Sequence, residues 1–562
     1  MRPTICALVI ATWATACHRG NDHADDAADG DASGSDGGTA SGSDGGVPEG
    51  CAAESLLDPG PMYLRRLTHR EYAATIVDVV AADPDQAQAL VATFPQDVVT
   101  SSFDNDGLHQ SISVLLGERY LDAAEQLADA VLADATRRDR VIGCDPAAGE
   151  ACLRDFVTRF GRRAMRRPLD DEEIDALVEL ALGQAEPDAQ ASIVIETVLM
   201  SPRFLFKVEL GTPDPDHPER AKLGGFEVAT RLSYLLWGTT PDDVLLDAAA
   251  AGQLDDADGV ATMAEAMLDD GRVQTAMAQF GAQWFRLDDI AGQARDAASF
   301  PEFDAALQQA MVDELQALLQ RHMFGDGEDF LDLYRTRSTA VNDALAAIYG
   351  VTPPGSSTLV PIELPEDGER GGLFTTAAFA TASSRADETS PVQRAVYVRK
   401  LALCDPPPPP PPGVPQVQPE DGESTQDAFE RHIDQGDSCA GCHLQLDPIG
   451  FGLERFDSIG RLRDSYGSGD PVKRDGTITI DGTEHAFSGG VELGALVADS
   501  QAAQGCVVTH AWRFALGRSE DPADECNREQ VRLRFADAGN DFRSLLLALV
   551  RSDAFRYRRI EP

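Results

Sequence analysis

The residues with the most specific chemistry in this chain are the five at positions 439–443, which read Cys-Ala-Gly-Cys-His. In a C-x-x-C-H motif the two thiols add to the vinyl groups of a haem, and the adjacent imidazole binds the iron from the proximal side. Cys439 and Cys442 are therefore the predicted attachment residues, and His443 is the predicted proximal ligand. The motif predicts one covalently bound haem c as the cofactor.

Two other kinds of site use the same residue types. A redox dithiol of the thioredoxin kind follows an apolar strand, whereas residues 432–438 are mostly polar. A structural zinc site needs two more ligands, and the sequence has no second C-x-x-C or H-x-x-x-H pair near the motif. Haem is favoured over both alternatives.

The sequence leaves the sixth ligand of the iron open. The last methionine is Met323, so a methionine ligand would have to come from another domain. The nearby imidazoles are His432, His485 and His510, and each is a candidate for bis-His ligation. An iron with no second protein ligand is the remaining alternative.

Residues after the motif are candidates for supporting the haem. Asp447-Pro448 is expected to form a turn, either an ordinary one or one whose backbone carbonyl accepts the free N–H of His443. Phe451 and Phe456 are expected to shield a haem face or to pack in the core.

The N-terminus predicts export. Residues 1–16 form a short apolar segment that is too short to span a bilayer and ends in small residues. Ala14-Thr15-Ala16-Cys17 resembles a bacterial lipobox, which predicts a lipidated Cys17, although the usual Leu is absent. An outer-membrane lipoprotein facing the periplasm or the cell surface is therefore favoured, with a secreted or periplasmic protein as the alternative.

Charge and composition limit the partners. The formal net charge is -47, which argues against nucleic acid and against electrostatic binding to an anionic bilayer. Residues 21–46 are almost entirely Asp, Gly, Ser and Ala, and such a segment is expected to be a disordered tether. The lipid anchor is the only membrane contact that we expect, and a redox protein or a small electron donor or acceptor is the expected partner.

Six cysteines remain after Cys6, the lipobox and the haem pair are set aside. An even number in an exported chain favours disulfides, although six cysteines allow 15 pairings. Short separation favours Cys144 with Cys152 and Cys506 with Cys526. Elimination then leaves Cys51 for Cys404.

Helical signals dominate the body of the chain. Asp170 and Glu173 form a capping-box pattern, residues 226–237 have amphipathic helical spacing, and Ser390-Pro391 is typical of a helix start. The clearest strand signal is a hairpin over 477–487. The predicted fold is a mainly α, multidomain protein with a small c-type haem segment that contains this hairpin.

The expected domain boundaries follow these signals. The proline run at 406–412 favours an extended strut or hinge ahead of the haem segment. The predicted order is a signal (1–17), a tether (18–50), an N-terminal helical domain (51–140), a helical module (144–210), a central helical domain (211–365), a helical segment (366–405), the polyproline linker (406–420), the haem segment (421–500) and a C-terminal helical module (501–562).

Five sequence blocks in a fixed order carry a family resemblance. They are RRLTHREY (65–72) with FDN (103–105), FGRRAMRRPL (160–169), SPRFL (201–205) with RLSYLLW (231–237), RGGL (370–373) with TSP (389–391), CAGCH and DPIGFGLERFD (447–457), and FALGR (514–518). The chain resembles a planctomycete- and myxobacterial-type family of exported multidomain proteins, built from domains of unknown function with an embedded cytochrome c motif. This resemblance implies no particular reaction.

Three hypotheses about function follow. The first is an envelope-anchored, monohaem c-type protein that transfers electrons or supports an oxidoreductase partner. The second is a haem enzyme with an open iron position, and the third is a cell-surface binding scaffold whose haem is structural. The sequence leaves open whether the chain is an enzyme.

Spacing also predicts an internal repeat. Segments 150–210 and 504–560 share the order of their Cys, Phe, Arg-Pro and Ser-x-x-Phe features, and each has an apolar helical stretch before the serine. We expect two copies of one helical module, with Phe160 matching Phe514 and Phe204 matching Phe555.

Overall fold

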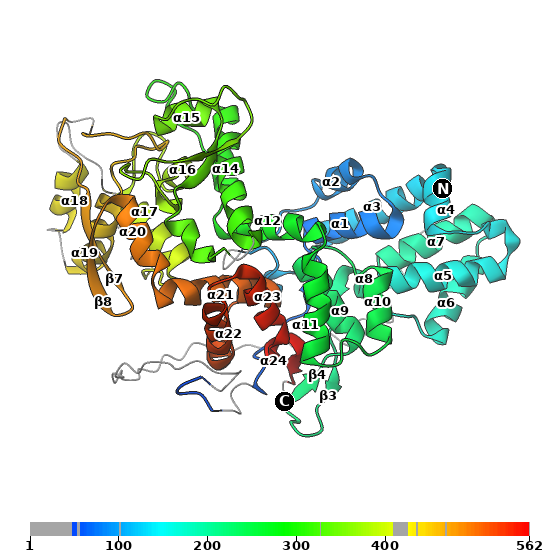
Figure 1. The fold of residues 1–562 in the computed structure, drawn as a ribbon. Coiled ribbons are helices and arrows are strands. Elements are labelled where there is room, and N and C mark those ends of the chain that lie inside the picture. Colours follow the sequence, from blue (N-terminus) through cyan, green and yellow to red (C-terminus); the bar gives the residue numbers. More distant parts are fainter. Residues whose placement is uncertain are drawn as a thin grey trace. The chain divides into compact units, whose positions relative to one another are not determined.

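A computed structural model describes residues 48–52, 57–99, 103–325, 328–408, 417, 425–433, 437–466 and 469–560, with the backbone alone at 425, 430 and 437–440. The expected signal segment, Cys17, most of the tether and most of the proline run lie outside the described residues. As predicted, the fold is mainly helical, with small antiparallel strand pairs (Figure 1). No helix in the described ranges is long and apolar enough to cross a membrane.

The N-terminal elements pack around one apolar core, which includes Tyr72, Tyr120, Phe156 and Phe204. In chain order they are β1 (Arg65–Arg66), α1 (His69–Val80), α2 (Pro84–Val91), η2 (Gly107–His109), α3 (Val114–Ala133), α4 (Ala135–Val141), η3 (Pro146–Ala148), α5 (Glu150–Ala164), α6 (Asp171–Leu182), α7 (Pro187–Leu199), α8 (Pro202–Leu205) and β2 (Phe206–Lys207).

A second, larger core joins the rest of the chain. Its first elements are β3 (Thr212–Pro213), β4 (Arg220–Lys222), α9 (Gly225–Leu236), α10 (Asp243–Ala250), α11 (Ala257–Leu268), α12 (Arg272–Trp284), α13 (Asp288–Ala291), α14 (Ala305–Phe324), η4 (Phe330–Tyr334), β5 (Ser338–Val341), α15 (Asp343–Tyr349), β6 (Val360–Glu363), η5 (Leu373–Thr375), α16 (Ala377–Ala382), α17 (Pro391–Tyr397) and η6 (Val398–Ala402).

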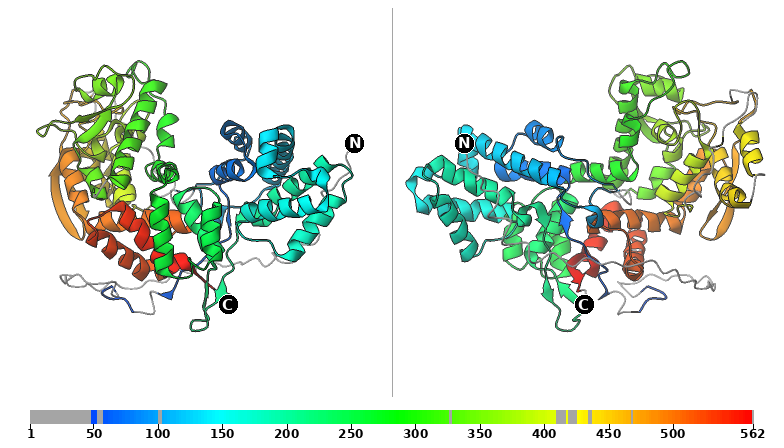
Figure 2. Two further views of the ribbon diagram at one scale, coloured as in Figure 1. Left: turned by 45° about the vertical axis from the view of Figure 1, so that its right-hand side comes forward. Right: turned by 180° about the vertical axis from the view of Figure 1, so that it is seen from behind.

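The remaining elements complete the chain, and most of them contribute residues to this core. They are α18 (Thr425–Ile433), α19 (Asp437–Phe451), β7 (Asp475–Ile480), β8 (Thr483–Ser488), α20 (Gly489–Ala498), α21 (Gln501–Leu516), η7 (Pro522–Asp524), α22 (Glu525–Asp537), α23 (Phe542–Arg551), α24 (Asp553–Arg556) and β9 (Tyr557–Arg559). The helices α9 and α11 pack against α23 and α24, which are far from them in sequence, and Figure 2 shows these green and red helices side by side.

Several local predictions are confirmed. Asp170 and Glu173 form the expected capping box at α6, and Ser390 caps α17 with Pro391 at its first position. The predicted hairpin is the pair β7 and β8, turned at Asp481-Gly482, where both residues have positive φ.

Two parts of the chain repeat one arrangement. The first module comprises β1, α1 and α5 to β2, and the second comprises β4, α9 and α21 to β9. Each module begins with a strand that is followed by a helix. Three helices that pack on one another come later in the chain, and a one-turn helix follows them. The module ends with a second strand that pairs with its first strand. The predicted internal repeat is therefore present, and it includes a strand and helix that the sequence pattern did not reveal.

The backbone register of the two modules agrees. Leu67 N–H donates to the Leu205 carbonyl at 2.8 Å, and Leu223 N–H donates to the Arg556 carbonyl at 2.9 Å. Because Leu205 and Arg556 are separated by the same offset as Phe204 and Phe555, the predicted Phe204–Phe555 match agrees with this register.

The other predicted match is out of register. Arg167 pairs with Glu173, and Arg518 pairs with Asp524 six residues later in the same way, so these arginines occupy equivalent positions. With that offset Phe160 corresponds to Ala511 and not to Phe514, a displacement of three residues. Apolar residues recur about once per turn on an amphipathic helix, so the sequence pattern matched Phe160 to a residue nearly one turn from its true equivalent.

The disulfides differ in part from the prediction. Cys144 is bonded to Cys152 as predicted, but Cys404 is bonded to Cys506 and Cys51 to Cys526. The predicted pairs Cys506–Cys526 and Cys51–Cys404 are therefore wrong. Sequence proximity failed because the segments around Cys51 and Cys404 pack on the C-terminal module, which brings distant cysteines together.

The proline run does not separate two bodies, contrary to the predicted strut. α17 precedes it and α19 follows it, yet the two helices pack directly. The contact is close at Gly450, where a Cβ would lie 2.1 Å from the carbonyl oxygen of Pro391. The run therefore joins two segments of one folded unit.

Candidate functional site

The CAGCH motif lies on α19, which packs against α17, α18 and β7. The Cys442 thiol is free and half-buried. The side chain of Cys439 is outside the described part of the structure. Since Cys51, Cys144, Cys152, Cys404, Cys506 and Cys526 pair with one another, none of the disulfides uses Cys442.

The His443 ring is held by a carboxylate one helical turn further along α19. Its Nδ1 lies 2.9 Å from Oδ1 and 3.1 Å from Oδ2 of Asp447, so Nδ1–H donates to this carboxylate. Nε2 has no recorded hydrogen-bond partner among the described residues, and it is the nitrogen that remains for a metal. A carboxylate that orients a ligating imidazole in this way is typical of metal sites.

The acceptor at Asp447 corrects the sequence prediction. Asp447-Pro448 was expected to form a turn, but α19 continues through Pro448 to Phe451. The acceptor is consequently the Asp447 side chain and not a backbone carbonyl. The signal that could have revealed it is the i, i+4 spacing of His443 and Asp447, which brings side chains together on a helix.

Aromatic rings surround the His443 imidazole. The His432 ring lies 5.0 Å away at an interplanar angle of 70°, and the Phe429 ring lies 5.5 Å away at 75°. Phe451 contacts Phe429 edge-on at 5.6 Å. Phe451 is buried and reaches His443 only through Phe429, so core packing is shown and the shielding of a haem face stays a prediction.

Phe456 also packs in the core. It is buried beneath the Arg370 guanidinium, whose central carbon lies 4.8 Å from the ring centroid.

Burial changes the protonation of these groups. Burial raises the pKa of Asp447, while the hydrogen bond from His443 opposes that rise. Burial also lowers the pKa of His432, and the nearby His443 lowers it further. Neutral His432 is therefore favoured at neutral pH.

The three candidate sixth ligands have different surroundings. His432 on α18 is the one that the structure brings next to His443. His485 lies on β8 opposite Ile478, with no described ring contact to His443. His510 is buried on α21, where it stacks on Trp284 at 4.6 Å.

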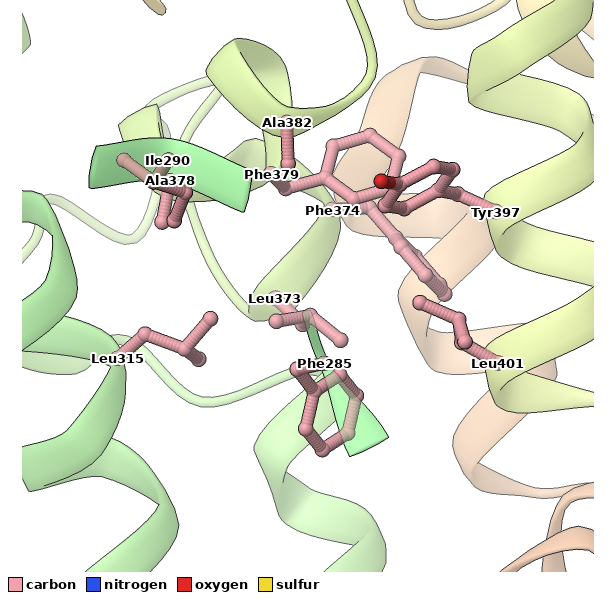
Figure 3. Close-up of a pocket in the computed structure, with 10 residues that line it drawn as sticks. All are labelled: Phe285, Ile290, Leu315, Leu373, Phe374, Ala378, Phe379, Ala382, Tyr397 and Leu401. Carbon is pink, nitrogen blue, oxygen red and sulfur yellow. The ribbon is translucent and has the colours of Figure 1, made fainter. Parts of the chain in front are cut away.

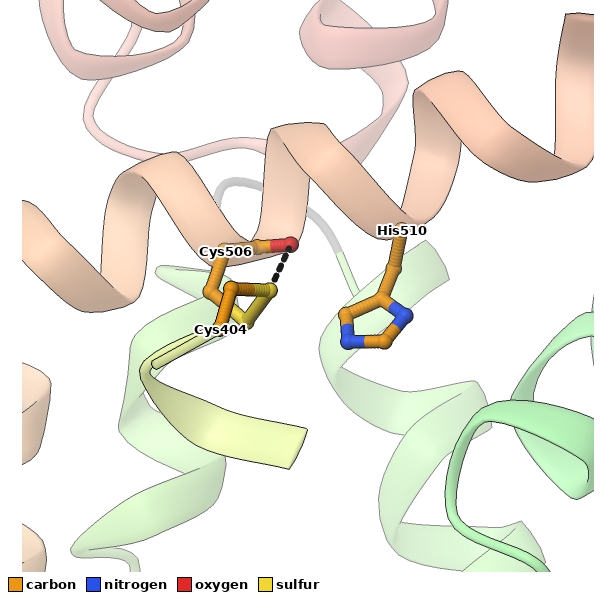
Figure 4. A group of neighbouring side chains, drawn as sticks. All are labelled: Cys404, Cys506 and His510. Carbon is orange, nitrogen blue, oxygen red and sulfur yellow. Dashed lines mark hydrogen bonds between the residues drawn. A yellow bond between two sulfur atoms is a disulfide. The ribbon is translucent and has the colours of Figure 1, made fainter. Parts of the chain in front are cut away.

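His510 belongs to a different cluster, with Cys404 and Cys506 (Figure 4). Their sulfur and ring nitrogen atoms lie within 4.8 Å of one another, a spacing suited to a metal. The sulfurs form a disulfide here, however, so neither is a thiolate ligand. Burial keeps the pKa of His510 well below its usual value, and a neutral imidazole results.

A buried ion-pair network lies just after the C-terminal end of α19. Arg394 donates to the Glu454 carboxylate at 2.9 Å, and both side chains are almost completely buried. Arg394 also donates to the Leu453 carbonyl, and Thr389 donates to Glu454 at 2.6 Å. The network ties the segment after CAGCH to the segment before the proline run.

A small pocket elsewhere in the larger core is lined mainly by apolar side chains (Figure 3). It is lined by Phe285, Ile290, Leu315, Leu373, Phe374, Ala378, Phe379, Ala382, Tyr397 and Leu401. The Tyr397 hydroxyl is the polar group among them, and it lies 3.4 Å from the Asp289 carboxylate. These side chains suit an apolar occupant better than acid–base chemistry.

Five family models match the chain in tandem, all described as proteins of unknown function. In chain order they are DUF1587 (65–133), DUF1595 (152–209), DUF1592 (223–351), DUF1588 (370–466) and DUF1585 (483–555). The five matched regions follow one another along the chain between residues 65 and 555. The DUF1588 domain contains the Arg394–Glu454 pair, the proline run and CAGCH. No curated protein and no solved structure is significantly similar to the chain.

Proposed function

We propose that this five-domain protein is a monohaem c-type cytochrome that transfers electrons at the cell envelope. The observation that carries the proposal is the arrangement of α19, where the free Cys442 thiol adjoins an imidazole whose Nδ1 is held by Asp447. The residues present fit a haem c: Cys439 and Cys442 would attach it, and Nε2 of His443 would bind its iron. The haem would supply a one-electron redox centre.

Exposure at the motif supports electron transfer. Cys442 and His443 are partly exposed, and the neighbouring Leu444 is 67% exposed. An apolar side chain beside a partly exposed redox centre suits transient docking of a redox partner or a small electron carrier. The His443–Asp447 hydrogen bond also supports a second candidate, a haem enzyme with an open iron position, because a carboxylate makes the proximal ligand more basic.

A matched pair of histidine variants tests the site. The full chain is expressed with haem c maturation, together with His443→Ala and His485→Ala. We expect the Soret band and reversible one-electron reduction in the parent and in His485→Ala, and altered ligation or failed maturation in His443→Ala. Equal spectra for all three proteins would contradict His443 as the ligand.

Ligand binding separates electron transfer from the haem enzyme. We expect an electron-transfer centre to keep its spectrum when cyanide or imidazole is added. Rapid binding of either ligand would instead favour the enzyme with an open position.

We also propose export and lipid anchoring through Cys17. The three disulfides support an oxidising compartment, since such bonds persist outside the cytosol. Cys17→Ser is expected to move the protein from the membrane to the soluble fraction. Unchanged fractionation, together with an unmodified Cys17 in the parent, would support plain secretion.

A further inference from the structure

The geometry points to Asp447 as the residue that holds the redox potential of the His443 centre low. This inference rests on the proposed haem attachment and concerns a positioning residue, because Asp447 acts on the iron through the imidazole. Its carboxylate lies 2.9 Å from Nδ1 of His443, on the side of the ring away from Nε2.

The Asp447 carboxylate is buried, and no lysine or arginine in the described part of the chain forms an ion pair with it. The residue is 7% exposed, and His443 is its recorded ion-pair partner among the described residues. Glu454 in the same domain is buried too, but Arg394 and Arg463 compensate its charge. Asp447 is therefore the buried carboxylate whose charge is left to act on the imidazole.

That charge favours the oxidised state of a metal at Nε2. Ferric iron carries one more positive charge than ferrous iron, so a nearby negative charge stabilises it more. The effect is greater inside a protein than in water because the effective dielectric constant is lower. The hydrogen bond adds to it, since a carboxylate that accepts Nδ1–H makes the imidazole a stronger donor.

The surroundings limit competing effects. Phe429 places apolar surface beside the His443 ring, Phe451 packs behind Phe429, and the His432 imidazole lies 5.0 Å from that of His443. The Lys473 ammonium lies 5.9 Å from the Phe451 ring centroid, and Phe451 contacts the Phe429 ring that packs on His443. A change of charge at Asp447 should therefore act mainly through His443.

The test compares midpoint potentials of the haem-loaded full chain. Asp447→Asn keeps the size of the side chain and removes its charge, and Asp447→Glu keeps the charge. Asp475→Asn is the matched control, because it removes an exposed carboxylate on β7, which packs against α19. We expect Asp447→Asn to raise the potential so that the ferrous-to-ferric ratio at a fixed potential increases about tenfold, or 59 mV for one electron.

For both control variants we expect a ferrous-to-ferric ratio within about twofold of that of the parent at the same potential. Asp447→Glu keeps the negative charge, and water screens the exposed charge that Asp475→Asn removes. An unchanged potential in Asp447→Asn, with its haem intact, would overturn this inference and leave the proposed function standing. A parent protein without covalent haem would instead refute the proposed function.

A second uncharged variant guards against failure to mature. If Asp447→Asn does not accumulate with haem, Asp447→Ser is measured in its place, and the same rise in potential is expected.

Discussion

The two modules share one hydrogen-bonded frame but differ in the charges buried within it. In the first, Glu71 accepts the N–H of Thr68 at the start of α1 and also the buried ammonium of Lys207 at 2.7 Å. In the second, Glu227 accepts the N–H of Gly224 at the start of α9 and has backbone N–H groups as its other donors. The same cap position therefore forms an ion pair in one module and accepts backbone N–H groups alone in the other.

The connections between the matched helices differ even more. Residues 81–149 join α1 to α5 in the first module, whereas residues 237–500 join α9 to α21 in the second. The longer connection includes CAGCH. This frame therefore tolerates a large insertion between its first helix and its last three, and the candidate site lies within the insertion.

Glu209 joins the two modules, and its loss should have the largest effect. It accepts from Arg65 of β1 at 2.9 Å and from Arg231 of α9 at 2.8 Å, and all three side chains are buried. Glu209→Gln would leave two guanidiniums poorly compensated, so we expect the free energy of unfolding to fall by about 5 kcal/mol. Glu219→Gln, at an exposed position, should change it by less than about 1 kcal/mol. Urea denaturation measures both.

The ion pairs of Glu209 with Arg65 and Arg231 also predict that the free energy of unfolding depends on pH. Burial alone would raise the pKa of Glu209, but Arg231 and Arg65 lower it to about 2. Because the folded pKa is below the unfolded one, the stabilisation is present above about pH 4.5 and is lost as the pH falls towards 2. The difference between the parent and Glu209→Gln should therefore shrink from pH 5 to pH 2. A constant difference would contradict the buried ion pair.

The disulfides sharpen the comparison of the modules. Cys152 closes a local loop with Cys144, at a separation of 8 residues, whereas Cys506 closes one with Cys404 at a separation of 102. Loop-closure entropy predicts that Cys404→Ala/Cys506→Ala lowers the free energy of unfolding by about 4.7 kcal/mol and Cys144→Ala/Cys152→Ala by about 2.5 kcal/mol. Denaturation of the two double variants measures both losses. A larger loss for Cys144→Ala/Cys152→Ala than for Cys404→Ala/Cys506→Ala would contradict the loop-closure prediction.

The two cap carboxylates should give the smallest difference. Glu71→Gln leaves the buried Lys207 without its counter-charge, which costs about 3 kcal/mol. Glu227→Gln weakens backbone caps alone, at a cost of about 1 kcal/mol. Equal losses for the two variants, measured by denaturation at pH 7, would show that the Lys207 ion pair contributes nothing beyond the cap.

Local signals predicted local structure well. The capping box at Asp170, the Pro391 helix start and the Asp481-Gly482 hairpin each depend on a few neighbouring residues, and each is present. The repeat was found from residue order, but its register was off by nearly one turn at Phe160. The two-residue strand β1 was too short to show any alternation.

Features that depend on distant contacts could not be predicted. Cys51 meets Cys526 across almost the whole chain, and no spacing rule indicates that partner. At the candidate site, the sequence supplied Cys442 and His443 but not the continuation of α19 through Pro448. That continuation is what brings the Asp447 carboxylate to the ring, and the packing of α19 against α17 and β7 accompanies it.

Peptide mass mapping shows whether haem is covalently attached at Cys439 and Cys442. The full chain, matured with the haem c machinery, is digested beside Cys439→Ala/Cys442→Ala, and Cys144→Ala/Cys152→Ala serves as the cysteine control. The account predicts one haem mass on the CAGCH peptide of the parent and of the control, and none in the motif variant. An unmodified CAGCH peptide from the matured parent would contradict the account.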